Sequence, residues 1–174
     1  LSSLEAHMLP GTEGAARPFW SPDSRQLAFF VGQQLKKVPA AGGPPQLISE
    51  GMGGSDGSWS TDGVILFDAG AADPIRRVSA AGGVPTEVVA PDRSQGETTV
   101  GWPAFLPDGQ HFLYVVTLSQ GRSRLKLGTL GSTESLPISD NARACCRRCS
   151  RMRVRCCWSL SSRAPSSNAA GLPV

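Results

Sequence analysis

The chain repeats itself at an interval of about 40 residues, and this repeat limits the possible folds more than any other feature. An aromatic residue and an aspartate recur 39 residues further on, and a Gly-Gly pair recurs 40 residues further on. A third aspartate follows 46 residues after the second, which indicates an added loop. The repeated positions are Trp20, Pro22 and Asp23; Trp59, Asp62 and Gly63; Trp102, Phe105, Pro107, Asp108 and Gly109; and the pairs Gly42, Gly43 and Gly82, Gly83. A period of this length, with several short strands in each unit, is typical of β-propeller blades.

Each copy carries the parts of a small antiparallel sheet. A tight turn at residues 21–24, 60–63 or 106–109 follows the aromatic residue, since each segment carries an aspartate together with proline, glycine or both. An apolar strand follows each turn, and the glycine pairs predict hairpins into further strands at 46–48 and 86–89. We expect the aromatic residue to be a large buried anchor between neighbouring blades. The sequence predicts an all-β chain, an incomplete β-propeller of about three four-stranded antiparallel blades.

The turn motifs resemble those of the TolB-like, WD-type β-propeller repeat. Residues 8–141 resemble, more narrowly, the propeller at the C-terminal end of bacterial eukaryotic-like serine/threonine protein kinases. The segments that carry this narrower resemblance are 9–15, 35–38, 62–67 and 96–99. The resemblance implies a role in sensing or protein interaction, and a parent chain with a kinase domain elsewhere.

The resemblance also sets the expected boundaries. Residues 1–14 would end a preceding blade, three blades would occupy 15–54, 55–99 and 100–141, and residues 142–174 would form an irregular tail. A propeller needs about four to eight blades to close. We therefore expect exposed strand edges or blade faces, with missing blades of the same parent chain as their partners.

No catalytic apparatus is expected in this chain. The sequence lacks the glycine-rich loop, the His-Arg-Asp motif and the Asp-Phe-Gly motif of protein kinases. We expect a non-catalytic sensing or protein-interaction module, without cofactor or metal, that belongs to a bacterial serine/threonine protein kinase. Two alternatives stay open: a TolB-like periplasmic interaction protein without a kinase, and the propeller of a prolyl-oligopeptidase-like hydrolase.

An unknown protein or small molecule, bound at the propeller face, is the expected ligand. Propellers bind through the loops between blades, so residues 50–56 and 92–99 are the first segments to test. No apolar run is long enough to cross a membrane, and residues 1–5 read as mid-protein sequence. We expect the extracytoplasmic side of a membrane-anchored parent, or the periplasm, with no membrane contact by this segment and no specific nucleic acid.

Two sequence patterns suggest hydrolytic chemistry, and each has a simpler structural explanation. Residues 53–57 match Gly-x-Ser-x-Gly, but they lack the apolar strand before and the helix after that a nucleophile elbow requires. We expect a flexible loop there. Asp23, Asp62 and Asp108 recur at equivalent positions, yet they lie in turn tetrapeptides, so we expect them to stabilise turns.

The histidines and the paired cations also have structural explanations. His7 and His111 have no second metal ligand at a suitable spacing, and we expect both to be solvated residues at strand edges. Residues 36–37 and 76–77 are basic pairs at the same place in successive copies. We expect them to mark one exposed strand edge, where cations discourage aggregation.

The last 33 residues break the pattern. Residues 142–174 hold seven arginines, no acidic residue and all five cysteines, whereas residues 1–141 carry a net charge of −4. A zinc site at Cys146, Cys149, Cys156 and Cys157 is disfavoured, because the second pair is adjacent and the arginines repel a cation. The arginines alone predict only nonspecific attraction to phosphate. We favour an out-of-frame, non-native tail, which translating the other two reading frames would test.

Overall fold

The chain folds into three four-stranded antiparallel sheets, and it has almost no helix in the part that the structure describes. The computed structural model describes residues 8–51, 53–70 and 73–140. The first sheet contains β1 (Ala16–Trp20), β2 (Gln26–Val31), β3 (Gln34–Pro39) and β4 (Gln46–Glu50). The second contains β5 (Asp56–Trp59), β6 (Val64–Asp68), β7 (Ile75–Ser79) and β8 (Thr86–Val89). The third contains β9 (Glu97–Phe105), β10 (His111–Leu118), β11 (Ser123–Thr129) and β12 (Ser135–Ser139), and a 3₁₀ turn, η1 (Arg93–Gln95), precedes it.

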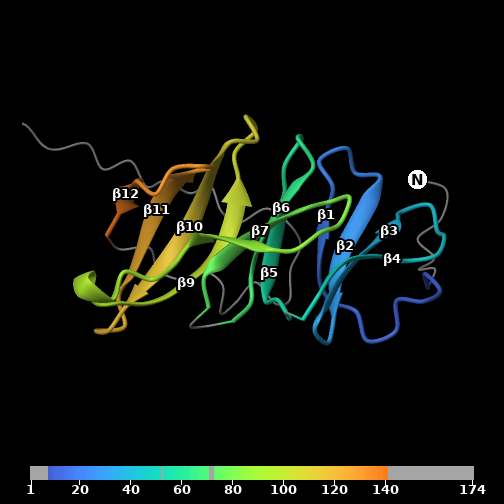
Figure 1. Cartoon of the computed structure of the whole chain (residues 1–174), viewed down its shortest axis with the longest axis horizontal. Helices are drawn as coiled ribbons and strands as arrows, with labels where there is room; N and C mark the ends of the chain where they lie inside the picture. Colours follow the sequence, from blue (N-terminus) through green and yellow to red (C-terminus); the bar gives the residue numbers. More distant parts are fainter. Residues whose placement is uncertain (1–7, 52, 71–72, 141–174) are drawn as a thin grey trace, which may run out of the picture. The chain divides into compact units, whose positions relative to one another are not determined.

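Each sheet is built from one continuous stretch of chain, as the colour order in Figure 1 shows. Consecutive strands pair as neighbours, so each sheet is a simple up-and-down meander. We call the sheets blade 1, blade 2 and blade 3 in chain order. The predicted fold class, an incomplete propeller of three four-stranded blades, is confirmed.

Blade 1 packs against blade 2 through a core that both sheets supply. Phe30 and Leu35 of blade 1 and Phe67 and Val78 of blade 2 are buried in one cluster. The rings of Phe30 and Phe67 are tilted at 51°, with centroids 6.0 Å apart. Blade 2 in turn packs on blade 3 through a second cluster that includes Leu66 and residues of β10. Because both faces of blade 2 are covered, its strand β6 is nearly continuous in apolar residues.

The repeated aromatic residue points towards the preceding blade. Trp59 pairs with Ile65 and packs on the cluster shared with blade 1, and Phe105 packs on the cluster shared with blade 2. Phe19 and Trp20 are adjacent in β1, so their side chains point to opposite faces of the sheet. Phe19 packs on the cluster between blades 1 and 2, and Trp20 therefore points away from blade 2. Its side chain is 52% exposed. In blades 2 and 3 the predicted anchors, Trp59 and Phe105, are partly buried against the preceding blade. In blade 1 the prediction of a buried Trp20 is wrong.

Two boundaries differ from the sequence expectation. β9 begins at Glu97, so blade 3 starts inside the segment 55–99 that was assigned to blade 2. Residues 8–14 contain turns and no strand in the described part of the chain. The expected tail at 142–174, and His7, lie outside the described residues.

Asp23 and Asp108 stabilise their turns as the sequence predicts, but Asp62 does not. Among the described residues no group donates a hydrogen bond to the Asp62 carboxylate, and in that turn the Val64 amide donates to Ser60 Oγ at 3.1 Å instead. Asp23 accepts hydrogen bonds from the Ser21 hydroxyl at 2.6 Å and from the Arg25 amide at 3.0 Å. These hydrogen bonds lower the pKa of Asp23. Asp108 accepts from the amides of Gln110 and His111 at 2.9 and 2.8 Å. The amide donors lower the pKa of Asp108 to about 2, as expected for carboxylates that cap turns.

The edge positions predicted for the cations and for His111 are wrong. Residues 36–37 lie in β3 and residues 76–77 in β7, and each of these strands is paired on both sides. The Lys37 ammonium crosses to blade 2 and donates to the Ala80 carbonyl at 2.8 Å. His111 lies in β10, also an inner strand, and its Nδ1 is 2.7 Å from Asp108 Oδ2. Arg76 and Arg77 instead hydrogen-bond within blade 2, to Glu87 at 3.3 Å and to Thr86 at 3.3 Å.

The antiparallel pairing sends the connections to two opposite ends of each blade. The segments 51–55 and 90–96, which link successive blades, lie at the end where the innermost strands β1, β5 and β9 begin. The turns with the repeated aspartates lie at the other end. We call the first the loop face and the second the turn face. None of the described helical segments is long and apolar enough to span a lipid bilayer.

Candidate functional site

Three innermost strands present a different side chain at the same position near the loop face. Arg17, Asp56 and Trp102 each lie three residues before the repeated aromatic residue, in β1, β5 and β9. A cation, an anion and an indole ring therefore stand at equivalent positions of neighbouring strands. We call these three residues the inner-strand triad.

Backbone irregularities set two members of the inner-strand triad apart. Arg17 and Trp102 both have a φ of 53°, which residues other than glycine seldom adopt. Each lies where the pairing with the next strand shifts register, in β1 between Ala16 and Phe19, and in β9 opposite Leu113 to Val115. A bulge of this kind re-aims a side chain, and such strain often accompanies function. Trp102 is 37% exposed as a result.

Asp68 accepts hydrogen bonds at two members of the inner-strand triad, Asp56 and Trp102. Its carboxylate is buried at the end of β6 and directly opposite Asp56. One oxygen accepts from the amides of Ser55 and Asp56, at 3.2 and 3.1 Å. The other accepts from the amide of Trp102 at 2.9 Å. Asp68 thereby ties blade 2 to the bulge of blade 3.

The two aspartates of this site, Asp56 and Asp68, both have raised pKa values. Burial, reinforced by the Asp68 carboxylate, raises the pKa of Asp56 to about 6, and the Arg17 guanidinium opposes the shift. Burial also raises the pKa of Asp68, although its three amide donors act in the opposite direction. Among the described residues, no side chain or amide donates a hydrogen bond to the Asp56 carboxylate. Perturbed carboxyl groups beside an open surface are typical of binding and catalytic sites.

The stability of the chain should fall as the pH rises from about 4 to about 6. In this window folded Asp56, with a pKa of about 6, holds a proton that the unfolded chain has already lost. The raised pKa of Asp68 adds to the same trend. Asp56→Asn should flatten this dependence and raise the melting temperature above pH 6. Thermal unfolding across this range measures it, with the exposed Asp73→Asn as control; equal slopes in both variants would refute the assignment.

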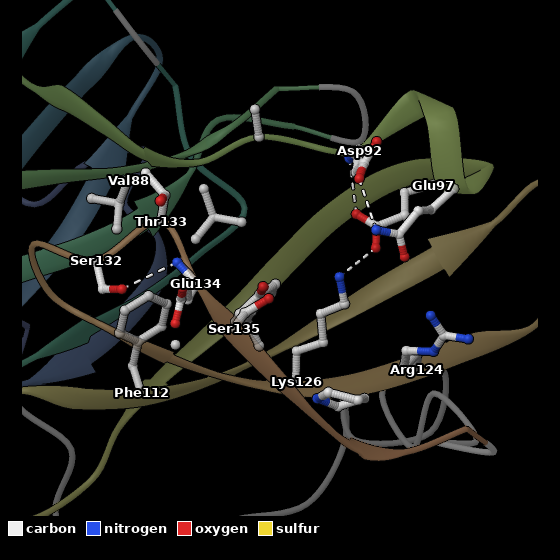
Figure 2. Close-up of a pocket in the computed structure, with 16 residues that line it drawn as sticks. Val88, Asp92, Glu97, Phe112, Arg124, Lys126, Ser132, Thr133, Glu134 and Ser135 are labelled. Atoms are coloured by element: carbon white, nitrogen blue, oxygen red, sulfur yellow. Dashed lines mark hydrogen bonds and ion pairs between the residues drawn. The ribbon is translucent and has the colours of Figure 1, made fainter.

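A second candidate site is a cleft of about 440 Å³ between blades 2 and 3. Figure 2 shows Val88 on one wall, Lys126 and Phe112 on the other, and Asp92 near the η1 end. Residues of the hairpin 130–134 close its far end. The lining carries charged groups of both signs, so the cleft suits a polar ligand better than an apolar one.

An ion pair is buried in the wall of this cleft. Lys126 Nζ lies 2.5 Å from Glu97 Oε1, and the two side chains are 11% and 2% exposed. The Asp92 amide donates to the other Glu97 oxygen at 2.9 Å. Figure 2 shows these contacts as one chain from η1 to β11. Since both charges are partnered, the pair fixes the strand β9 against β11 and keeps the wall polar.

The cleft exists because the two blade junctions are closed differently. Between blades 1 and 2, the Gly83 amide donates to the Ile48 carbonyl at 3.2 Å, next to the bond from Lys37 to Ala80. Among the described residues, no matching hydrogen bond joins the hairpin 130–134 to β8. The second junction therefore lacks the hydrogen bond that links the two blades at the equivalent place of the first.

The two loop segments chosen from the sequence reach these two sites. Segment 50–56 ends at Asp56 of the inner-strand triad, and segment 92–99 supplies Asp92, Gln95 and Glu97 to the cleft. The roles of Arg17, Asp68 and Lys126 were not predicted. The repeat in the sequence does show that Arg17, Asp56 and Trp102 occupy equivalent positions. The contacts of Asp68 and Lys126 depend on how the strands pair, which the sequence does not show.

Neither hydrolase nor metal chemistry gains support from the geometry. Gly53 to Ser55 form a loop and Asp56 begins a strand, so the Gly-x-Ser-x-Gly segment has no following helix, and the expectation of a loop is confirmed up to Ser55. Within residues 8–51, 53–70 and 73–140, no group of three His, Cys, Asp or Glu side chains could hold a metal ion.

No protein-family model and no curated protein sequence matches the chain. Solved structures do match it. A candidate TolB from Agrobacterium tumefaciens superposes with a TM-score of 0.60 at 20% identity, over 72% of this chain and 46% of that one. TolB from Acinetobacter baumannii gives 0.56 at 13% identity, over 73% and 33%.

A prolyl endopeptidase gives a TM-score of 0.54 at 12% identity, over 73% of this chain and 22% of the enzyme. The chain thus spans less than half the length of each of these three proteins. At such identities the likeness establishes the fold alone. The chain shares the β-propeller fold with TolB-like proteins and with related propellers.

Proposed function

We propose that the chain is a non-catalytic interaction module that binds its partner on the loop face. The observation that carries the proposal is the inner-strand triad. It sets a cation, a carboxyl group with a raised pKa and an exposed indole on adjacent strands. Such a mixture of charge and aromatic surface is suited to polar peptide segments or small polar ligands, and aromatic and arginine residues dominate binding energies.

We further propose that the module senses its ligand on behalf of a bacterial serine/threonine protein kinase, outside the cytoplasmic membrane. Support comes from the sequence resemblance of residues 8–141. The DNA around the coding region tests this directly. An upstream kinase domain supports it, a signal peptide alone favours a TolB-like periplasmic interaction protein, and a downstream Ser-Asp-His domain favours a hydrolase.

A photo-reactive amino acid placed at Trp102 should cross-link to a distinct partner in cells of the source organism. We expect this because Trp102 is exposed beside Asp56 at the loop face. The same probe at Gln110, which is exposed on the turn face of the same blade, should give no such product. The cross-linked bands are compared by electrophoresis and mass spectrometry.

The triad itself can be tested in the same cells. Asp56→Asn combined with the Trp102 probe should reduce the cross-linked product, because the variant removes the negative charge next to the probe. If both probe positions gave the same products, or if neither gave any, the loop face would not be the binding surface.

A further inference from the structure

The hairpin of blade 3 differs from the other two hairpins at one demanding backbone position. Gly43 and Gly83 hold the same place in blades 1 and 2, with φ of 138° and 142°. Residues other than glycine almost never adopt such a conformation. The strand pairing puts Thr133 at the equivalent place of blade 3, and its φ is not positive. The hairpin 130–134 therefore has a different backbone course from its two counterparts.

This difference explains why the cleft between blades 2 and 3 lacks the hydrogen bond of the first junction. There the Gly83 amide donates to the carbonyl of Ile48, the bulge residue of β4. Val88 is the bulge residue at the same place in β8, and it lines the cleft. No amide of the described hairpin 130–134 donates to Val88. By equivalence, the Val88 carbonyl is an acceptor to which blade 3 supplies no donor.

The cleft also has an excess of negative charge. The charged side chains that line it are Asp92, Glu97, Arg124, Lys126 and Glu134. Both cations already have carboxylate partners, since Lys126 pairs with Glu97 and Arg124 Nε donates to Asp140 at 2.6 Å. The donors to the Asp92 carboxylate are all neutral. The Glu134 carboxylate has no hydrogen bond or ion pair with any residue that the structure describes. The cleft therefore favours a cation, and Glu134 is the carboxylate free to bind it.

The free carboxylate lies beside apolar walls. Val88 and Val89 line the cleft from blade 2, and the rings of Phe112 and Tyr114 line it from blade 3. Figure 2 shows Val88, Phe112 and Glu134 around the same end of the cleft. A carboxylate next to apolar and aromatic surface suits an ammonium ion that carries a hydrocarbon stem.

We propose that this cleft binds a small organic amine. The ammonium group donates to the Glu134 carboxylate and to the Val88 carbonyl, and the hydrocarbon stem lies between the two valines and the ring of Phe112. The volume of about 440 Å³ is within the range of about 300–1,000 Å³ that is usual for small-molecule sites. No residue of the inner-strand triad lines the cleft, so this site is separate from the binding surface proposed above.

Titration of the ¹⁵N-labelled full chain with three probes, followed by NMR in reducing buffer, tests the proposal. Pentylamine, 1-pentanol and pentanoate share a five-carbon stem and differ in charge. We expect pentylamine to give saturable shifts at the amides of 88–89 and 130–134, the alcohol to bind about tenfold more weakly, and pentanoate not to bind. Equal affinity for the amine and the alcohol, or shifts confined to residues outside the cleft, would overturn the proposal.

Three variants test the named contacts with the same pentylamine titration. Glu134→Gln keeps the shape of the side chain and removes its charge, so the affinity should fall about tenfold. Thr133→Gly should also weaken binding, since glycine lets the hairpin donate its own amide to Val88. Glu50→Gln removes a carboxylate at the exposed end of β4 in blade 1 and should leave the affinity unchanged.

The spectra of the free variants verify that each keeps the fold, which we expect because Glu134, Thr133 and Glu50 are all exposed. An unchanged affinity in Glu134→Gln or Thr133→Gly would contradict the proposed contacts, and an equal loss in Glu50→Gln would reduce the effect to general attraction between charges.

Discussion

Lys126→Met should lower the free energy of unfolding by about 3–5 kcal/mol, which is the usual cost of removing one partner of a buried ion pair. The variant leaves the Glu97 carboxylate, 2% exposed, with the Asp92 amide as its only hydrogen-bond donor among the described residues. An uncompensated buried charge is far more costly than the loss of one hydrogen bond. The effect should be large because Glu97 anchors β9, the innermost strand of blade 3.

Urea unfolding monitored by tryptophan fluorescence measures this change. The double variant Lys126→Met with Glu97→Gln should recover most of the lost stability, since a neutral amide still accepts from the Asp92 amide and leaves no buried charge. A double-mutant cycle then gives the coupling between the two side chains. A loss below about 1 kcal/mol for Lys126→Met, the size found for exposed pairs, would show that water reaches the pair freely.

Phe67→Ala should cost about 3–5 kcal/mol, because it empties a buried aromatic site at the centre of the junction between blades 1 and 2. Phe67 is fully buried and packs on the ring of Phe30. Neighbouring sheets cannot readily collapse into the space, since each is held by its own ladder of hydrogen bonds. Much of a typical domain stability of about 5–15 kcal/mol is at stake.

Phe67→Leu provides the matched control for this prediction. It keeps an apolar side chain at the site and should cost clearly less than the alanine variant. Both are measured by urea unfolding at one pH and one protein concentration. Equal and small losses for the two variants would mean that blades 1 and 2 are not held together by this core.

The repeat pattern predicted the fold because each blade uses local rules. The turn aspartates, the glycine hairpins and the apolar strands act within about 40 residues, so the sequence alone locates them. Trp20 shows the limit of such reasoning. The pattern identifies it as an equivalent of Trp59, but its burial depends on a neighbouring blade that residues 8–140 do not supply.

The sequence predicted less of the candidate site than of the fold. The segment 50–56 was selected for its place between blades, and it does contain Asp56. The role of Asp68 was hidden, because the strand 64–68 reads as an ordinary apolar run that happens to end in aspartate. Its three amide partners come from β5 with the loop before it and from β9, and only the fold brings them together. Lys126 and Glu97 were hidden for the same reason, since 29 residues separate them.

The carboxylate of Asp68 also has a meaning for how such chains can be rearranged. At the equivalent place blade 1 has Phe30, whose ring tip lies against Gly54 of the neighbouring blade, whereas Asp68 accepts a hydrogen bond from the Trp102 amide. At this point the junction between blades 1 and 2 is apolar, whereas the junction between blades 2 and 3 is polar. If the blades were reordered or duplicated, the Asp68 carboxylate would face a neighbouring blade that offers it no amide donor. The three blades therefore have a fixed order, although their sequences are similar.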